Sequence, residues 1–231
     1  MPLVLILLLG LLCSCTVGNT HEPRTVTIAL DEAPQNLDAR IGIDATSERL
    51  IQLIYGSLVK RSRDFAIEPD LALSWDIPNP TTYIFHLRDD AFYHDGGKVT
   101  SRDVVFTFRS VLDRSVKTTK AGTYRLVESV EAPDDHTVVF KLKEPVAPFL
   151  FNLTRGGMGI VPEGSPPNIA NNPIGSGAFR FVRYIPDGEV VLERFDRYYA
   201  DKPKIQREDK PFVCIFSVFR REVSSHAVSF M

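Results

Sequence analysis

The stretch from Tyr83 to Asp113, YIFHLRDDAFYHDGGKVTSRDVVFTFRSVLD, predicts a strand, a turn and a helix in succession. Its first residues alternate between apolar and other side chains with the period of a β-strand. Asp95-Gly96-Gly97 is typical of a turn, because glycine adopts positive φ at little cost. Thr100 and Asp103 have the spacing of a capping box, which satisfies free amides where a helix begins. The apolar residues of the predicted helix then recur on one face: Val104, Val105, Phe108, Val111 and Leu112.

Around this unit the sequence predicts further strands and helices in irregular alternation. A strand is expected at Thr25–Leu30, and a helix from about Glu48 to Leu58 with Thr46 or Ser47 as its N-cap. The other predicted elements are a strand carrying Val138, Phe140 and Leu142, a short apolar element at Phe149–Leu153, and a hairpin of Phe179–Tyr184 with Glu189–Arg194. This order favours an α/β or mixed α+β fold with a mixed sheet.

The overall composition is that of an ordinary globular protein. The chain has 231 residues, of which 44% are hydrophobic and 24% are charged, which suits one or two domains. Lys and Arg number 27 against 29 Asp and Glu, and neither half is strongly basic. A nucleic-acid partner is therefore not expected.

The strand–turn–helix stretch resembles a block in the extracytoplasmic solute-binding proteins, family 5, of bacterial ABC importers. That block reads roughly F-x-L-R-x-x-x-x-[FW]-x-D-G-x-x-[LV]-T-x-x-D-V-V-[FY]-[ST]. The matching positions are Phe85, Leu87, Arg88, Asp95, Gly96, Val99, Thr100, Asp103, Val104, Val105, Phe106 and Thr107, with Tyr93 in the aromatic position.

Other segments extend this resemblance in order from about Thr25 to Ile205. They are Asn36-Leu37-Asp38, Leu53–Val59, Glu68–Trp75, Pro173–Phe179 and Val191–Ile205. The chain departs from the family pattern at Ala39, where proline is usual, at Gly56-Ser57 in place of Glu-Gly, and at Tyr199 in place of tryptophan.

The resemblance implies the first lobe of a two-lobed periplasmic-binding-protein fold of type II, incomplete and with a mixed sheet. It implies binding of an oligopeptide or another small solute and delivery of that solute to an ABC permease in the membrane. It implies no catalysis and no cofactor.

After Ile205 the family pattern is no longer visible. We expect residues 16–205 to form the N-terminal lobe and residues 206–231 to be a divergent tail produced by truncation or a frameshift. The alternative is genuine divergence, with the tail packing as a helix or strand. A single lobe would leave the ligand cleft exposed and one sheet edge unpaired. The alternative function is therefore a non-transporting remnant or interaction fragment that lacks the second lobe.

The N-terminus predicts export. Leu3–Leu12 is apolar apart from Gly10 and is too short to span a bilayer, as in the core of a signal peptide. Leu12-Cys13-Ser14-Cys15 resembles the bacterial lipoprotein processing motif, which makes residues 1–15 the signal peptide and Cys15 the lipidated residue. The alternative is a cleaved secretory signal without lipid. Either outcome places the protein in the periplasm or at the cell surface, with Cys15 as the membrane anchor in the first.

Candidate ligand-binding residues follow from the resemblance. In the family, the segment after the Leu-Asp element borders the cleft, where backbone groups pair with a peptide main chain. It corresponds here to Ile43, Asp44, Ala45 and Thr46, although Asp44–Ser47 would also cap the following helix. Tyr124 is either a cleft aromatic or a core residue. Asp44 is a candidate partner for a ligand amine.

Other chemistry has no support in the sequence. The five histidines lack the spacing of a metal site, and no cysteine pair accompanies them. Gly175-Ser176-Gly177 precedes a strand rather than a helix, and Ser176 lacks the frame of a hydrolase nucleophile. Asp95 and Asp103 are explained by a turn and a helix cap. The sequence therefore predicts a binding protein with no metal, no cofactor and no enzymatic activity.

Overall fold

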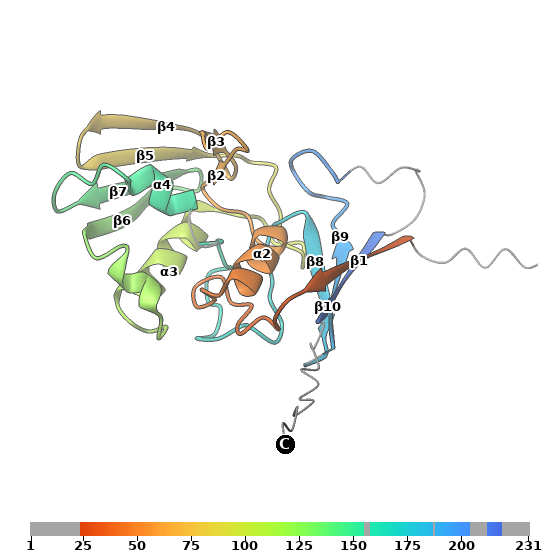
Figure 1. The fold of residues 1–231 in the computed structure, drawn as a ribbon. Coiled ribbons are helices and arrows are strands. Elements are labelled where there is room, and N and C mark those ends of the chain that lie inside the picture. Colours follow the sequence, from red (N-terminus) through yellow and green to blue (C-terminus); the bar gives the residue numbers. More distant parts are fainter. Residues whose placement is uncertain (1–23, 155–157, 187, 204–211, 219–231) are drawn as a thin grey trace, which may run out of the picture.

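The computed structural model describes residues 24–154, 158–186, 188–203 and 212–218. Two four-stranded sheets and one two-stranded sheet are formed by these residues. Figure 1 shows the two larger sheets at opposite sides of the molecule, with helix α2 (Ala45–Ile54) between them. No helix within the described ranges is both long and apolar enough to cross a membrane.

The first large sheet, which we call the contiguous sheet, is built from one continuous part of the chain. Its order is β4-β5-β7-β6, with every neighbouring pair antiparallel. Its strands are β4 (Ala72–Asn79), β5 (Thr82–Leu87), β6 (Val127–Asp134) and β7 (Thr137–Leu142). Helix α3 (Ser101–Leu112) packs along one face of this sheet, against β6 and β7.

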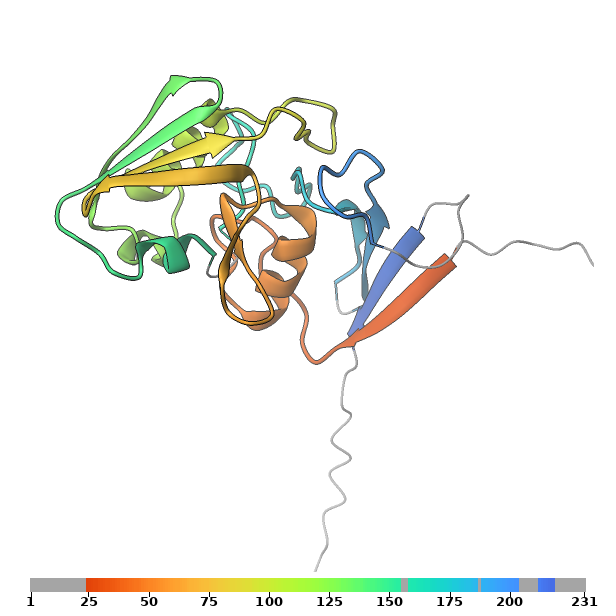
Figure 2. The same ribbon diagram turned by 90° about the horizontal axis from the view of Figure 1, so that it is seen from above.

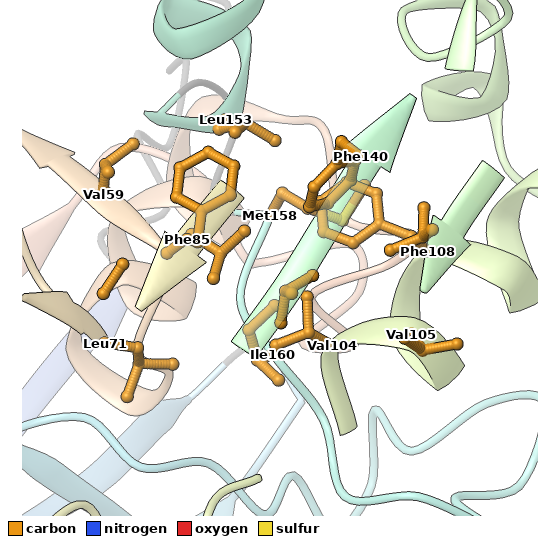
Figure 3. Close-up of a cluster of buried hydrophobic side chains, with 14 of the residues drawn as sticks. Val59, Leu71, Phe85, Val104, Val105, Phe108, Phe140, Leu153, Met158 and Ile160 are labelled. Carbon is orange, nitrogen blue, oxygen red and sulfur yellow. The ribbon is translucent and has the colours of Figure 1, made fainter. Parts of the chain in front are cut away.

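An aromatic core joins α3 to the contiguous sheet (Figure 3). The Phe140 ring meets the rings of Phe108 and Phe85 edge to face, with centroid distances of 4.9 and 5.7 Å. All three phenylalanines are almost completely buried. Such pairs add to the stabilisation that burial of apolar area already provides.

The second large sheet, which we call the assembled sheet, combines distant parts of the chain. Its order is β1-β10-β9-β8, formed by β1 (Arg24–Leu30), β10 (Phe212–Val218), β9 (Glu189–Arg194) and β8 (Phe179–Tyr184). The β1–β10 pair is parallel and the other two pairs are antiparallel, which makes the sheet mixed. The apolar face of α2 and the loops beside it form a second core with this sheet.

The other described elements are smaller. They are the hairpin of β2 (Val59–Arg61) and β3 (Ile67–Pro69), the 3-10 turn η1 (Thr119–Gly122), and the short helix α4 (Phe149–Thr154). Helix α4 contacts β2 and β3. Figure 2 shows that the two large sheets stay well separated when the molecule is seen from above.

Several of the predicted elements are confirmed. The hairpin strands β8 and β9 have the predicted bounds, and α3 begins after Thr100, whose backbone N–H donates to Asp103 Oδ2 over 2.7 Å. The mixed α/β fold class is likewise confirmed. The prediction for α2 was wrong at both ends. Its N-cap is Asp44, and the helix ends at Ile54, whose backbone O accepts the Gly177 N–H over 2.9 Å.

Strand β10 lies within the stretch that we expected to be a divergent tail. Strand β10 occupies the position between β1 and β9, so that it pairs on both sides. Cys15 and the rest of the predicted signal peptide lie outside the described residues. The proposed boundary at residue 205 lies outside them as well.

Candidate functional site

The loop before α2 is a tight turn that its own hydrogen bonds hold. Ile41 N and Gly42 N both donate to Asp38 O over 2.9 Å, and Asp38 N donates to Asn36 Oδ1 over 2.8 Å. A Cβ atom on Gly42 would lie 2.3 Å from Asn36 O. Only glycine therefore fits at this position, immediately before the predicted ligand-binding segment.

A buried ion pair fixes this loop to a distant part of the chain. Arg40 Nε and Nη2 donate to the two carboxylate oxygens of Asp38 over 3.0 and 2.8 Å, and both side chains are buried. Asp38 Oδ2 also accepts the Ile169 N–H over 3.1 Å, and Arg40 Nη2 donates to Pro166 O over 2.6 Å. These charges have protein partners on both sides, as burial requires. The pair is therefore a structural support for the loop.

The predicted segment Ile43–Thr46 divides into exposed and buried residues. Ile43 is 54% exposed and Ala45 is exposed as well, whereas Thr46 is buried. Asp44 caps α2, since its Oδ1 accepts the Ser47 N–H over 2.8 Å. Its Oδ2 accepts the Gln35 N–H over 3.4 Å. The carboxylate thus has a structural role in the free protein, which was one of its two predicted roles.

The segment around η1 packs against this loop. Lys120 Nζ donates to Ala39 O over 2.7 Å, a bond between residues 81 positions apart. Burial lowers the pKa of the Lys120 ammonium to about 8, while Glu48 and Asp38 act in the opposite direction. The ammonium therefore connects the loop and η1 at a position close to two carboxylates.

Tyr124 is a core residue that also lines a surface recess. Its ring is almost fully buried and meets Phe108 edge to face at 5.2 Å, which makes it part of the core. Its hydroxyl donates to Asn152 O over 3.0 Å, and the residue also lines a surface recess.

Two adjoining recesses lie where these segments meet. The α2 recess has a volume of about 260 Å³ and is lined by Ile43, Glu48, Thr119, Lys120, Thr123, Tyr124 and Asn152. The loop recess has a volume of about 470 Å³ and is lined by Gln35, Asn36, Ile41, Gly42, Ile43, Asp44, Lys117, Thr118 and Thr119. Ile43 and Thr119 line both, so the two recesses adjoin at these residues, and we call them together the joined recess.

The structure thus brings three of the five predicted ligand residues together. Ile43, Asp44 and Tyr124 line the joined recesses, whereas Ala45 and Thr46 do not. Glu48 and Lys120 line the α2 recess and were not predicted. Glu48 had a signal in the sequence, as an acidic residue in the first turn of α2. Lys120 had none, because its position depends on a contact with a distant loop.

The polar groups elsewhere have the roles expected from the sequence. Asp95 Oδ1 accepts the Gly97 N–H over 3.0 Å within the turn, and Asp103 caps α3. His86 pairs with Asp76 at 2.9 Å on the exposed face of the contiguous sheet. Within the described ranges, no three His, Cys, Asp or Glu side chains are grouped so that they would hold a metal ion.

Comparison with known proteins identifies the family. Residues 66–208 match the family model described as bacterial extracellular solute-binding proteins, family 5, middle part. The chain belongs to this family. The match includes the contiguous sheet, α3, β8 and β9.

Individual relatives agree with the family match. A Brucella ovis protein described as a candidate ABC transporter peptide-binding protein is 40% identical over 152 residues, covering 60% of this chain and 28% of the relative. The periplasmic binding protein AgaA of A. tumefaciens R10, solved with agropinic acid, gives a TM-score of 0.75 at 27% identity over 84% of this chain and 40% of that chain. DppA of Helicobacter pylori, solved with the peptide STSA, gives a TM-score of 0.73 at 26% identity over 83% and 42%.

The chain thus spans less than half the length of these relatives. The chain therefore belongs to a solute-binding protein family of bacterial ABC importers. It contains only part of the fold of the relatives.

Proposed function

We propose that this chain binds a peptide or another small solute outside the cytoplasm, for delivery to an ABC permease. The observation that carries the proposal is the joined recess at Ile43 and Thr119, which two distant segments form and the Lys120–Ala39 bond supports. The structures of relatives in complex with a peptide and with agropinic acid support a small solute as the ligand.

The recess offers a distinct chemistry for each part of a peptide. The exposed Ile43 side chain and the edge of Tyr124 give it apolar surface, and the backbone at Ile43 and Asp44 would pair with a peptide main chain. Asp44 and Glu48 would attract a ligand amine. Because both oxygens of Asp44 already accept backbone N–H groups, an amine would share that carboxylate with the helix cap.

The test is retention of ligands by the full chain. The protein would be equilibrated with a mixture of peptides of two to five residues together with agropinic acid, then separated from free ligand, and the bound fraction read by mass spectrometry. Peptides should be enriched and recovered intact, because we propose no catalytic activity. Recovery of agropinic acid without any peptide would mean that the ligand is another small solute and not a peptide.

A matched pair of variants locates the binding site. Ile43→Arg places a charge in the recess and should reduce retention at least tenfold, a loss of about 1.4 kcal/mol. Ile77→Arg is the control, because Ile77 is 48% exposed on β4 and does not line the recess. Equal retention by both variants would contradict the site. Asp44→Ala with unchanged peptide affinity would remove Asp44 as an amine partner.

A chain that retains no solute would favour the alternative, a non-transporting or interaction fragment. The relatives are more than twice as long as the matched part, so their complete activity is carried over here only as a proposal.

Export and lipidation are proposals of the same kind. We propose that residues 1–15 contain a lipoprotein signal peptide that is cleaved before Cys15, and that Cys15, as the new N-terminus, carries a lipid in the periplasm or at the cell surface. We further propose that residues 16–205 form the N-terminal lobe. Labelling of cells with a fatty-acid analogue should mark the protein and its Cys13→Ser variant but not Cys15→Ser. Labelling of neither the protein nor the variants would favour plain secretion.

A further inference from the structure

The tip of the β2–β3 hairpin carries a residue that is unfavourable there in both its backbone and its side chain. The turn closes through two hydrogen bonds, from Ser62 N to Ala66 O over 2.9 Å and from Phe65 N to Ser62 O over 3.2 Å. Phe65 has a φ of +63°, in the left-handed region where glycine or asparagine is usual. Its ring is 71% exposed, so burial does not offset the strain. Strained residues of this kind cluster at functional sites.

A second exposed ring lies beside this tip. Helix α4 contacts both strands of the hairpin (Figure 1), and its Phe151 is 37% exposed. The guanidinium carbon of Arg61 lies 5.1 Å from the ring centroid of Phe65 and 5.7 Å from that of Phe151. Cation–π contacts hold a guanidinium in place and leave it charged. We call this surface cluster, together with the exposed Arg63 of the turn, the hairpin patch.

The charge of the hairpin patch is positive. Lys60 of β2 lies opposite Glu68 of β3, so these two charges offset each other. Arg61 and Arg63 remain, against the single carboxylate of Asp64 in the turn. Within the described ranges, neither arginine forms an ion pair. Two guanidinium groups beside exposed rings therefore outnumber the acid next to them.

The small size of the hairpin patch favours a membrane over a protein as its partner. A stable protein–protein interface takes about 20 residues from each partner. The patch consists of one turn and one ring of α4. A bilayer accepts such a surface, because a ring that enters the interfacial layer is buried without a matching pocket. Each nearby arginine adds attraction to anionic headgroups. Apolar side chains that are exposed within a polar rim are typical of such sites.

We propose that the hairpin patch docks this protein on a membrane surface that carries anionic lipid headgroups. The Phe65 ring enters the interfacial layer, while Arg61 and Arg63 lie at the headgroups. The left-handed conformation of Phe65 then serves to keep the ring exposed at the tip. This docking is separate from solute binding, since Phe65 and Phe151 line neither the loop recess nor the α2 recess.

An indole at the tip tests the docking directly. The full chain would carry Trp75→Phe and Phe65→Trp, so that position 65 holds the only indole. Leu5→Asp and Leu8→Asp in every variant keep the apolar N-terminal run off the membrane. The protein would be mixed with vesicles of brominated phosphatidylcholine, with or without phosphatidylglycerol. Bromine should quench the indole only when phosphatidylglycerol is present. The matched control combines Trp75→Phe with Ile77→Trp on the edge strand β4, 48% exposed in the native protein, and should not be quenched.

Charge variants of the same indole protein test the headgroup contacts. Arg63→Gln should raise the lipid concentration for half-maximal quenching about fivefold, because one cation near an anionic surface contributes this much. Asp64→Asn should lower that concentration by a similar factor. High salt should reduce both differences. Quenching at neither position, equal quenching at positions 65 and 77, or quenching that does not depend on lipid charge would overturn the proposal.

Phe65→Asn in the otherwise native tip separates docking from a structural role. Asparagine adopts the left-handed region readily, so the denaturation midpoint should not fall. Recovery with phosphatidylglycerol vesicles after flotation should fall about tenfold, because the ring is no longer buried in the interfacial layer. A lower midpoint with unchanged recovery would make Phe65 a structural residue and overturn the proposal. Indole emission that shifts with native bacterial membranes but not with lipid vesicles would assign the patch to a membrane protein and overturn a lipid partner.

Discussion

The two large sheets of this protein are stabilised in opposite ways. The contiguous sheet takes all of its strands from residues 72–142, joins them as antiparallel neighbours and packs them on an aromatic core. The assembled sheet joins β1 to β10, which are separated by more than 180 residues, through a parallel pair. Local pairs are inexpensive in chain entropy, whereas distant ones require closure of a long loop. The contiguous sheet should therefore fold and persist independently of the assembled one.

Removal of β10 tests this difference most directly. A chain that ends at residue 203 should lose the protection of β1 and β9 amides from hydrogen exchange, because both strands pair with β10. Amides of β5 and β7 should keep their protection, since their partners all lie within the contiguous sheet. Mass spectrometry of exchanged peptides resolves the two groups. Simultaneous loss in both sheets would show that the molecule is one cooperative unit.

The buried ion pair Asp38–Arg40 gives the next largest effect. Asp38→Asn leaves the Arg40 guanidinium buried without its counter-charge and should lower the free energy of unfolding by about 3–5 kcal/mol. Because the pair lies in the loop before α2, the loss should first appear in the assembled sheet. Denaturant titration measures the change. Asp76→Asn, in an exposed pair with His86, is the matched control and should cost less than about 1 kcal/mol.

In each of the two large sheets, the sequence predicted some strands and not others. The capping box of α3 and the bounds of β8 and β9 were predictable, because local turn and cap chemistry determines them. Strands β4 and β6 were not assigned. β4 is an edge strand with a mostly exposed pattern, and register shifts interrupt the pairing of β6. A strand at β10 was foreseen only as one alternative for the tail, because its pairing depends on the distant strands β1 and β9.

The candidate site was predictable only where a motif marks it. Ile43, Asp44 and Tyr124 were found through the family pattern, and they do line the joined recess. Lys120 was not found, since its significance comes from its bond to Ala39. That bond joins residues 81 positions apart, which no local pattern encodes.

The junction of the two sheets should weaken in acid through His94. Its backbone N–H donates to Gly175 O over 2.9 Å, and its Nε2 lies 3.1 Å from Gly177 O, just before β8. Burial lowers the pKa of His94 from 6.5 to about 4, with Arg180 acting in the same direction and Asp95 against it. The neutral ring is therefore the form that the folded protein favours.

The sign of the pH dependence follows from this lowered pKa. The contribution of His94 to stability is fully present above pH 6.5, where the unfolded chain is neutral as well. It should be lost as the pH falls from 6.5 through 4, by about 3 kcal/mol in total. Chemical denaturation at a series of pH values measures it. His94→Gln should flatten that part of the curve, and an unchanged slope in this variant would assign the acid sensitivity to another group.

The smallest effect is expected on the exposed face of the assembled sheet. Arg183 pairs with Glu189 across β8 and β9, with the arginine side chain about half exposed. Such pairs contribute about 0.2–1 kcal/mol, so Arg183→Gln should change the free energy of unfolding by no more than this. High salt should reduce even that difference. A larger loss would mean that cross-strand charges, rather than the pairing of β10 and the core under α2, hold the assembled sheet together.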